Sequence, residues 1–325
     1  MENRKATLIE PDFKLFTKEQ IIAATLQLAH EEGLPIALWR MPFQSEINLL
    51  VSFNQALELD QFDLQELKNG FALAPFNFNE KKGLFLQGDL LISFDFDEVI
   101  FKPTGSQNIE KTHRFKLGII DRIENGQDLP LYGNGKGLKT LKSTDYRDLV
   151  NKCIDAIQEG FVETVVPARI KDIELPASFD LIAFFNKLCA AYENAFISFV
   201  SLPAHGSWLG ATPEVLIERN EHIFRTAALA ATQKYNPENS LSETTWNQKE
   251  IEEQAMVSRY IINCFKKIRL RDFTEKGPET VKAGNLLHLK TTLEVDLLAT
   301  NFVELPTVML ELLHPTSAVA GMPKE

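Results

Sequence analysis

The order of apolar and polar residues along the chain predicts both strands and helices in its first half. Residues 47–51 and 84–94 alternate in the way typical of strands, and they follow an amphipathic helical stretch at residues 18–30. Between residues 102 and 144 this periodicity fades while Gly, Asn and Lys accumulate, which predicts a long loop or linker. The glycine-rich run at residues 133–137 does not match the GxxxxGK[ST] pattern of a phosphate-binding loop.

Helical periodicity returns after Asp145, which we predict to be the N-cap of a helix that ends at Gly160. The pattern then predicts a buried strand at 161–168, a helix at 181–191, a strand at 196–202, strands around a tight turn at 210–213, a long helix near 246–270, short strands at 286–298 and a helix near 303–313. Strands outnumber helices and do not alternate strictly with them. We therefore predict an α+β fold, a layered sandwich of mostly antiparallel sheets with flanking helices.

A single domain over residues 1–325 is the simplest division of this pattern. Within it we distinguish N-terminal strands at 1–101, the linker at 102–144 and a region at 145–325 that carries the motifs described below. A chain of this length can bury a large core, and its 44% hydrophobic and 24% charged residues are typical of a globular protein.

Charge excludes several classes of partner. The chain has 34 basic and 45 acidic side chains, a net charge of -11, which argues against nucleic acids and anionic membranes. No apolar run approaches the roughly 20 residues that span a bilayer, and residues 1–20 are too charged for a signal peptide, so we expect a cytoplasmic protein.

Three widely spaced cysteines in apolar helical surroundings, Cys153, Cys189 and Cys264, are predicted to be buried free thiols.

Two carboxylates extend the apolar face of the predicted long helix. Glu253 and Glu250 lie four and seven residues before Val257 and therefore on the same face. Such a pair either shares a divalent cation such as Mg²⁺ or lies solvated in the first turns, behind a capping box of Thr245 and Gln248. Spacing alone favours the second interpretation.

Glu214 is the one ionisable residue of the segment Gly210-Ala-Thr-Pro-Glu214, which lies between apolar strands. Burial would raise the pKa of its carboxyl group and suit it to act as a general acid. The alternative is an exposed carboxylate on a turn, and without further context it is the more common case.

Five segments taken in order change this balance. They are Gly210-Ala-Thr-Pro-Glu214, Ala228-Leu-Ala-Ala-Thr-Gln233, Lys249-Glu-Ile-Glu-Glu253, Leu287-His-Leu-Lys-Thr291 and Leu313-His-Pro-Thr-Ser-Ala-Val-Ala-Gly-Met-Pro-Lys324. The series resembles the chorismate-utilising enzymes from about residue 145 to the end. Its last two blocks are more similar to isochorismate synthases than to anthranilate or aminodeoxychorismate synthases.

The resemblance implies a magnesium-dependent isomerase of menaquinone or siderophore biosynthesis, with chorismate as its small-molecule substrate and no obligatory protein partner. Water would attack C2 of chorismate while the C4 hydroxyl leaves, with Mg²⁺ on the ring carboxylate. By resemblance, Glu214 is the general acid, Glu253 is a magnesium ligand supported by Glu250, and His288 lies beside the substrate ring. Ala231 and Thr232 are further substrate-binding positions.

The sequence departs from the family pattern at several positions. Thr164 stands where the family has the lysine that activates water, and a threonine hydroxyl is no general base near neutral pH. Ala231 replaces a glycine that allows close approach to the substrate, and Gln254 replaces a histidine. The resemblance also implies a further segment, with a Tyr, an Arg and a metal-binding Glu, that these 325 residues do not include.

Three hypotheses therefore compete. The first is an isochorismate synthase, and the second is a chorismate-binding homologue with little or no turnover, because the lysine base and the further segment are missing. The third is an ammonia-using relative, which the last two motif blocks disfavour.

Overall fold

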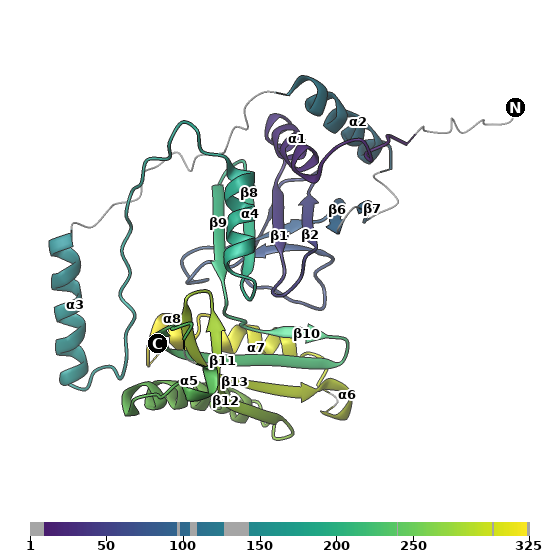
Figure 1. The fold of residues 1–325 in the computed structure, drawn as a ribbon. Coiled ribbons are helices and arrows are strands. Elements are labelled where there is room, and N and C mark those ends of the chain that lie inside the picture. The colour runs from purple at the N-terminus through teal and green to yellow at the C-terminus, as the bar shows by residue number, and fades with distance from the viewer. Residues whose placement is uncertain are drawn as a thin grey trace, which may run out of the picture.

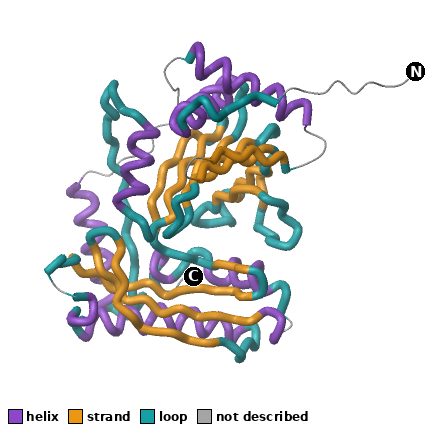
Figure 2. The backbone as a smooth tube through the Cα atoms, turned by 45° about the vertical axis from the view of Figure 1, so that its right-hand side comes forward, coloured by secondary structure: helices purple, strands orange, loops and turns teal. Residues whose placement is uncertain are grey.

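The computed structural model describes residues 10–95, 98–104, 109–126, 143–238, 240–300 and 302–323. Two antiparallel sheets, each packed against helices, form two halves that lie one above the other in Figure 1. Figure 2 shows the same two groups of strands, with helices above the upper group and below the lower group. This arrangement confirms the predicted α+β fold.

The first sheet has six antiparallel strands in the order β7-β6-β2-β1-β8-β9. In chain order they are β1 (Ile36–Arg40), β2 (Ile47–Val51), β6 (Leu90–Asp95), β7 (Glu98–Pro103), β8 (Phe196–Leu202) and β9 (Gly206–Thr212). Strand β1 pairs with both β2 and β8, so a strand from the motif region completes the N-terminal sheet.

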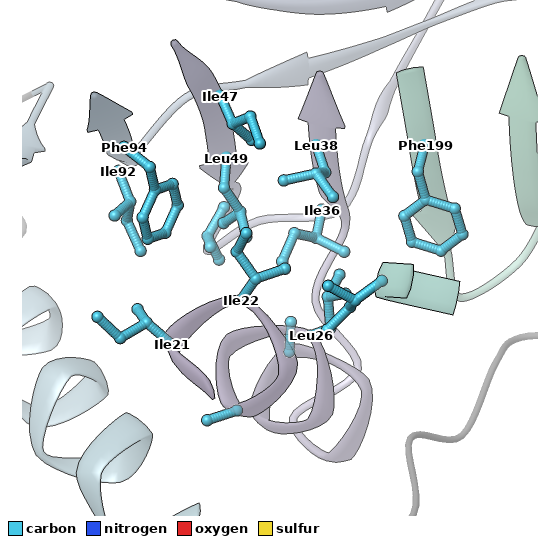
Figure 3. Close-up of a cluster of buried hydrophobic side chains, with 14 of the residues drawn as sticks. Ile21, Ile22, Leu26, Ile36, Leu38, Ile47, Leu49, Ile92, Phe94 and Phe199 are labelled. Carbon is cyan, nitrogen blue, oxygen red and sulfur yellow. The ribbon is translucent and has the colours of Figure 1, made fainter. Parts of the chain in front are cut away.

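Three helices cover one face of this sheet: α1 (Lys18–Glu31), α2 (Ile109–Asn125) and α4 (Leu181–Ala191). Figure 3 shows Ile22 and Leu26 of α1 directed at Leu38, Leu49 and their neighbours on the strands. Side chains one position away on β1 and β2, including Ala37 and Leu50, face the opposite side. There they contact a small sheet of β3 (Leu57–Leu59), β5 (Gly83–Gln87) and β4 (Gly70–Leu73).

The second sheet has the strand order β10-β11-β13-β12. The strands are β10 (Glu218–Asn220), β11 (Ile223–Lys234), β12 (Thr274–Ala283) and β13 (Leu286–Asp296). The accompanying helices are the short 3-10 helix η2 (Leu241–Glu243), α5 (Gln248–Lys267), α6 (Leu297–Thr300), α7 (Leu305–Leu313) and α8 (Ser317–Ala320). Val257, Ile261 and Cys264 of α5 are buried, as their helical spacing predicted, in a core shared with α7, β11 and β13.

The expected linker contains a helix. Helix α2 occupies 17 residues of the 102–144 segment, and it buries Phe115 and Ile119 in the first core. The loop prediction was wrong there because only a narrow apolar stripe, among many Lys, Arg and Glu residues, marks this helix in the sequence. The glycine-rich run at 133–137 lies outside the described residues.

The predicted buried strand at 161–168 is also wrong. A strand needs a hydrogen-bonded neighbour, and this segment pairs only through an isolated bridge between Thr164 and Met322. Phe161 is 72% exposed. The preceding helix, α3 (Ser143–Gln158), begins at Ser143, so Asp145 lies in its first turn and is not its N-cap.

Two smaller expectations also changed. Strand β9 continues through Thr212, so the hairpin turn lies at residues 203–205, and residues 213–217 form the connection to the second sheet. The three cysteines are thiols that form no disulfide within the described part of the chain, but only Cys264 is buried, while Cys153 and Cys189 are partly exposed. Among the described residues, no helix has the length and apolar composition required to cross a membrane.

Candidate functional site

One cavity of about 290 Å³ collects six of the seven predicted site residues. It lies between the end of β9, strands β11 and β13, helix α5 and the segment around α8. The predicted residues that line it are Thr164, Glu214, Ala231, Thr232, Glu253 and His288. Glu250 does not line it.

Glu214 reaches the cavity from the connection that leaves β9 for the second sheet. Burial raises the pKa of its carboxyl group above the ordinary value of 4.5, and a long hydrogen bond of 3.5 Å from the Thr316 hydroxyl to Oε1 lowers it by a smaller amount. A carboxyl group whose charged form is destabilised holds its proton at higher pH. This environment suits Glu214 to donate a proton.

A β-bulge in β11 shapes the opposite wall. Ala231 and Thr232 together oppose the single residue His288 of β13, because the pairing shifts between Ala230 and Gln233. His288 Nδ1 lies 2.9 Å from the Ala231 carbonyl oxygen and 3.3 Å from Thr232 Oγ1. A carbonyl oxygen only accepts hydrogen bonds, so Nδ1 carries the proton and Nε2 of the neutral ring is an acceptor.

The bulge places Ala231 in the left-handed region of backbone conformation, at φ 61°. Glycine adopts this conformation without cost, whereas a Cβ atom crowds the following carbonyl group. Ala231 therefore keeps the backbone shape that a glycine favours and adds a buried methyl group to the wall of the cavity.

Thr164 is held by its backbone. Its amide donates to the Met322 carbonyl at 3.3 Å, and the Met322 amide donates to the Thr164 carbonyl at 2.8 Å. The bridge fixes the α8 segment against residue 164, so the position of the expected base does line the cavity, with a hydroxyl group in place of an amine. That hydroxyl can hold a water molecule but cannot deprotonate it at neutral pH.

The two carboxylates of α5 have different surroundings. The helix begins at Gln248 with Asn247 as its N-cap, so the predicted capping box of Thr245 and Gln248 was wrong. Glu250 completes the box instead, and its Oε2 accepts bonds from the Asn247 amide at 2.8 Å and from Gln233 Nε2 at 3.0 Å. Glu253, one turn later, lines the cavity.

These residues do not amount to a metal site formed by protein groups alone. Within the described ranges, no three His, Cys, Asp or Glu side chains gather closely enough to hold an ion. The Oε2 atom of Glu250 is already bonded twice, which leaves Glu253 as the predicted ligand on the cavity wall. The assignment of Glu253 and Glu250 as magnesium ligands stays a prediction.

Sequence reasoning missed part of the cavity wall. Met256 also lines it, and its spacing of three residues from Glu253 on one helix could have indicated this. Ser317 and Met322 line it from the last motif block, where the resemblance carried the block as a whole and singled out neither residue.

A comparison with family models decides the classification. Residues 111–325 match the model described as chorismate binding enzyme, about two thirds of the chain. The chain belongs to this family. Its cavity is therefore the candidate active site of a chorismate binding enzyme, built from the segments that the family match covers.

Individual relatives are distant. The chain is 24% identical to the isochorismate synthase EntC of Escherichia coli (strain K12) over 189 residues, which cover 57% of this chain and 48% of EntC. It is 25% identical to the isochorismate synthase MenF of the same strain over 191 residues, covering 56% and 42% respectively. The chain thus spans about half the length of the curated relatives it matches.

Solved structures share the fold. The menaquinone-specific isochorismate synthase MenF from Escherichia coli aligns with a TM-score of 0.65 and 19% identity over 93% of this chain and 73% of MenF. Anthranilate synthase component I from Streptococcus pneumoniae TIGR4 aligns with a TM-score of 0.55 and 15% identity over 100% and 78%. At these identities the likeness concerns the fold.

Proposed function

We propose that this protein binds chorismate in the cavity around Glu214 and converts it slowly to isochorismate. The single observation that supports the proposal best is the cavity itself, because six residues from five separate segments of the sequence line it together. The relatives matched by sequence, EntC and MenF, are isochorismate synthases, which favours this reaction among those of the family.

The proposed chemistry gives each residue a limited task. Glu214, whose pKa burial raises, gives its proton to the C4 hydroxyl of chorismate, which departs as water. Thr164 orients the water that attacks C2, and the double bond shifts between the two positions. The proton released by the attacking water passes to solvent, since Thr164 cannot hold it. Without a positioned base the rate falls by roughly 10²–10⁴-fold.

The proposal includes Mg²⁺ as an ion that binds tightly only together with the substrate. A single protein carboxylate binds Mg²⁺ weakly, and this ion commonly completes its shell with water and substrate oxygens. We therefore expect calorimetry to detect tight Mg²⁺ binding only when chorismate is present. Glu253→Gln should abolish this dependence, and Glu252→Gln, a variant outside the cavity, should leave it intact. Equal Mg²⁺ binding by the wild type and Glu253→Gln would exclude Glu253 as a ligand.

Chromatographic measurement of isochorismate tests the proposed activity. The wild type should form product far more slowly than EntC under the same conditions, and Glu214→Gln should lower the remaining rate by about 10²–10⁴-fold. Thr164→Lys alone should not restore a rate like that of EntC. Turnover by the wild type at the rate of EntC would contradict the proposed role of position 164.

Binding without turnover is the second candidate function, and the threonine at the base position favours it. Calorimetry combined with product analysis separates the two. Chorismate that binds in a saturable way and is recovered unchanged after long incubation would support a binding role, whereas accumulation of isochorismate would support the enzyme.

A further inference from the structure

A serine that lines the cavity has a buried hydroxyl with no hydrogen-bond partner among the described residues. Ser317, the first residue of α8, is 3% exposed, and its Oγ is buried with no donor or acceptor of a described residue within bonding distance. Ser317 lines the same cavity as Glu214 and His288. Leaving a buried polar group unpaired is unfavourable, so such groups in folded proteins call for an explanation.

The surroundings of Ser317 show why the fold does not supply a partner. The neighbouring Thr316 hydroxyl is directed to Glu214 Oε1 at 3.5 Å, and the Ser317 carbonyl accepts from the Gly321 amide at 2.9 Å. Met322 then pairs with Thr164, which holds this short segment against the cavity wall. Rotation about the Cα–Cβ bond moves the Ser317 hydroxyl among three staggered positions, and a molecule in the cavity can give it a partner.

The charge of the cavity indicates what that partner is. Its described lining residues include Glu214 and Glu253 but no Lys or Arg. Neutral donors on the described wall are therefore available to bind the carboxylates of a dianionic ring substrate, beside any bound Mg²⁺. The hydroxyl groups of Thr164, Thr232 and Ser317 are the alcohol side chains among those lining residues, and Thr232 is already within 3.3 Å of His288.

We propose that Ser317 is a substrate-contacting residue, whose hydroxyl donates a hydrogen bond to a carboxylate oxygen of the dianionic ring substrate. The inference rests on the proposed function, since it needs chorismate to occupy this cavity. It explains why the free protein keeps an unpaired buried hydroxyl, because the bond forms when substrate enters. A hydrogen bond to a charged group is stronger than one between neutral groups.

Calorimetric titration with chorismate, using the whole chain, tests the proposal. Ser317→Ala should weaken chorismate binding by about 10-fold or more, the usual effect of losing a hydrogen bond to a charged group. Ser317→Cys keeps a weaker donor, so its chorismate affinity should lie between those of the wild type and Ser317→Ala. Ser201→Ala is the matched control, because Ser201 is also buried but pairs with Ser207 at 2.9 Å in the first sheet. Its chorismate affinity should equal that of the wild type.

Thermal unfolding without ligand supplies the second measurement. Ser201→Ala breaks a formed hydrogen bond and should lower the melting temperature, whereas Ser317→Ala removes an unpaired hydroxyl and should not lower it. Equal chorismate affinity in the wild type and Ser317→Ala would overturn the inference while leaving the proposed function intact. A wild type that does not bind chorismate would overturn both.

Discussion

At the residue scale, Glu214 illustrates how the burial of a carboxyl group can reduce stability. The wall of the cavity buries its carboxyl group, and Thr316 offers only one long hydrogen bond in return. The charged form is therefore less stable in the folded protein than in the unfolded chain. The same desolvation suits this carboxyl group to the proposed role of proton donor.

This shift predicts a pH dependence. The folded-state pKa of Glu214 is raised, so its contribution to the free energy of unfolding is complete below about pH 4.5 and is lost as the pH rises through the folded-state pKa. Glu214→Gln should remove this loss and be at least as stable as the wild type at pH 7, while any isomerase activity falls by about 10²–10⁴-fold. Urea unfolding at pH 4 and pH 7 checks the sign, and a clearly less stable variant at pH 7 would contradict it.

The left-handed backbone of Ala231 allows a second prediction. Ala231→Gly loses a buried methyl group but relieves about 1–2 kcal/mol of backbone crowding, so the free energy of unfolding should change little. Ala230→Gly on the same strand lacks this compensation and should cost about 1–2 kcal/mol. Denaturant titration of the pair measures the difference, and equal losses would show that the bulge imposes no strain.

At the element scale, a buried arginine fixes one helix end to the first sheet. Arg40 of β1 is 3% exposed, and its guanidinium donates to the carbonyls of Glu193 and Tyr192 at 2.6 Å, of Met41 at 3.0 Å and of Cys189 at 3.2 Å. Three of these carbonyls lie at the C-terminal end of α4, where a cation also opposes the negative end of the helix dipole.

Arg40→Met should therefore lower the free energy of unfolding by about 2–4 kcal/mol, since it removes four hydrogen bonds that a buried charged group donates. Arg40→Lys should recover only part of the loss, because an ammonium group has three donors and no planar fork. Arg122→Met is the control. Its ion pair with Glu31 lies at the surface, so the change should stay below about 1 kcal/mol. A similar loss in both variants would refute the assignment.

At the scale of the whole molecule, polar contacts join the two halves. His314 Nε2 lies 2.7 Å from the Pro75 carbonyl oxygen, and Thr307 Oγ1 accepts from the Leu64 amide at 3.1 Å. Helix α3 is further removed, at the left edge of the molecule in Figure 1. None of its described side chains is buried, although Tyr146 contacts Arg169 and the Pro167 carbonyl oxygen.

The isolation of α3 predicts an unequal response to the same substitution. Ile154 on α3 is 45% exposed, so Ile154→Ala should change the free energy of unfolding by less than about 0.5 kcal/mol. Ile261 on α5 is 4% exposed, and Ile261→Ala should cost about 2–5 kcal/mol. Chemical denaturation of both variants provides the test. A large loss for Ile154→Ala would mean that α3 packs against the body of the protein.

The sequence by itself determined the positions of those helices and strands that have a clear hydrophobic periodicity. Helix α4 and strands β2 and β8 lie where periodicity placed them, since burial of one face fixes both the period and the length of such elements. Ordered motifs were sufficient to predict the family and six residues that line one cavity. A motif is identified from its residue types and their order, so it can be found without knowing how the segments meet in the fold.

Only the tertiary structure decided which partners these residues have. Glu250 caps α5, Ala231 lies in a left-handed bulge, and the segment after α3 forms a single bridge in place of a strand. The unpaired Ser317 hydroxyl is likewise invisible in the sequence. Hydrogen bonds, burial and strand pairing join residues far apart along the chain, so no local pattern encodes them.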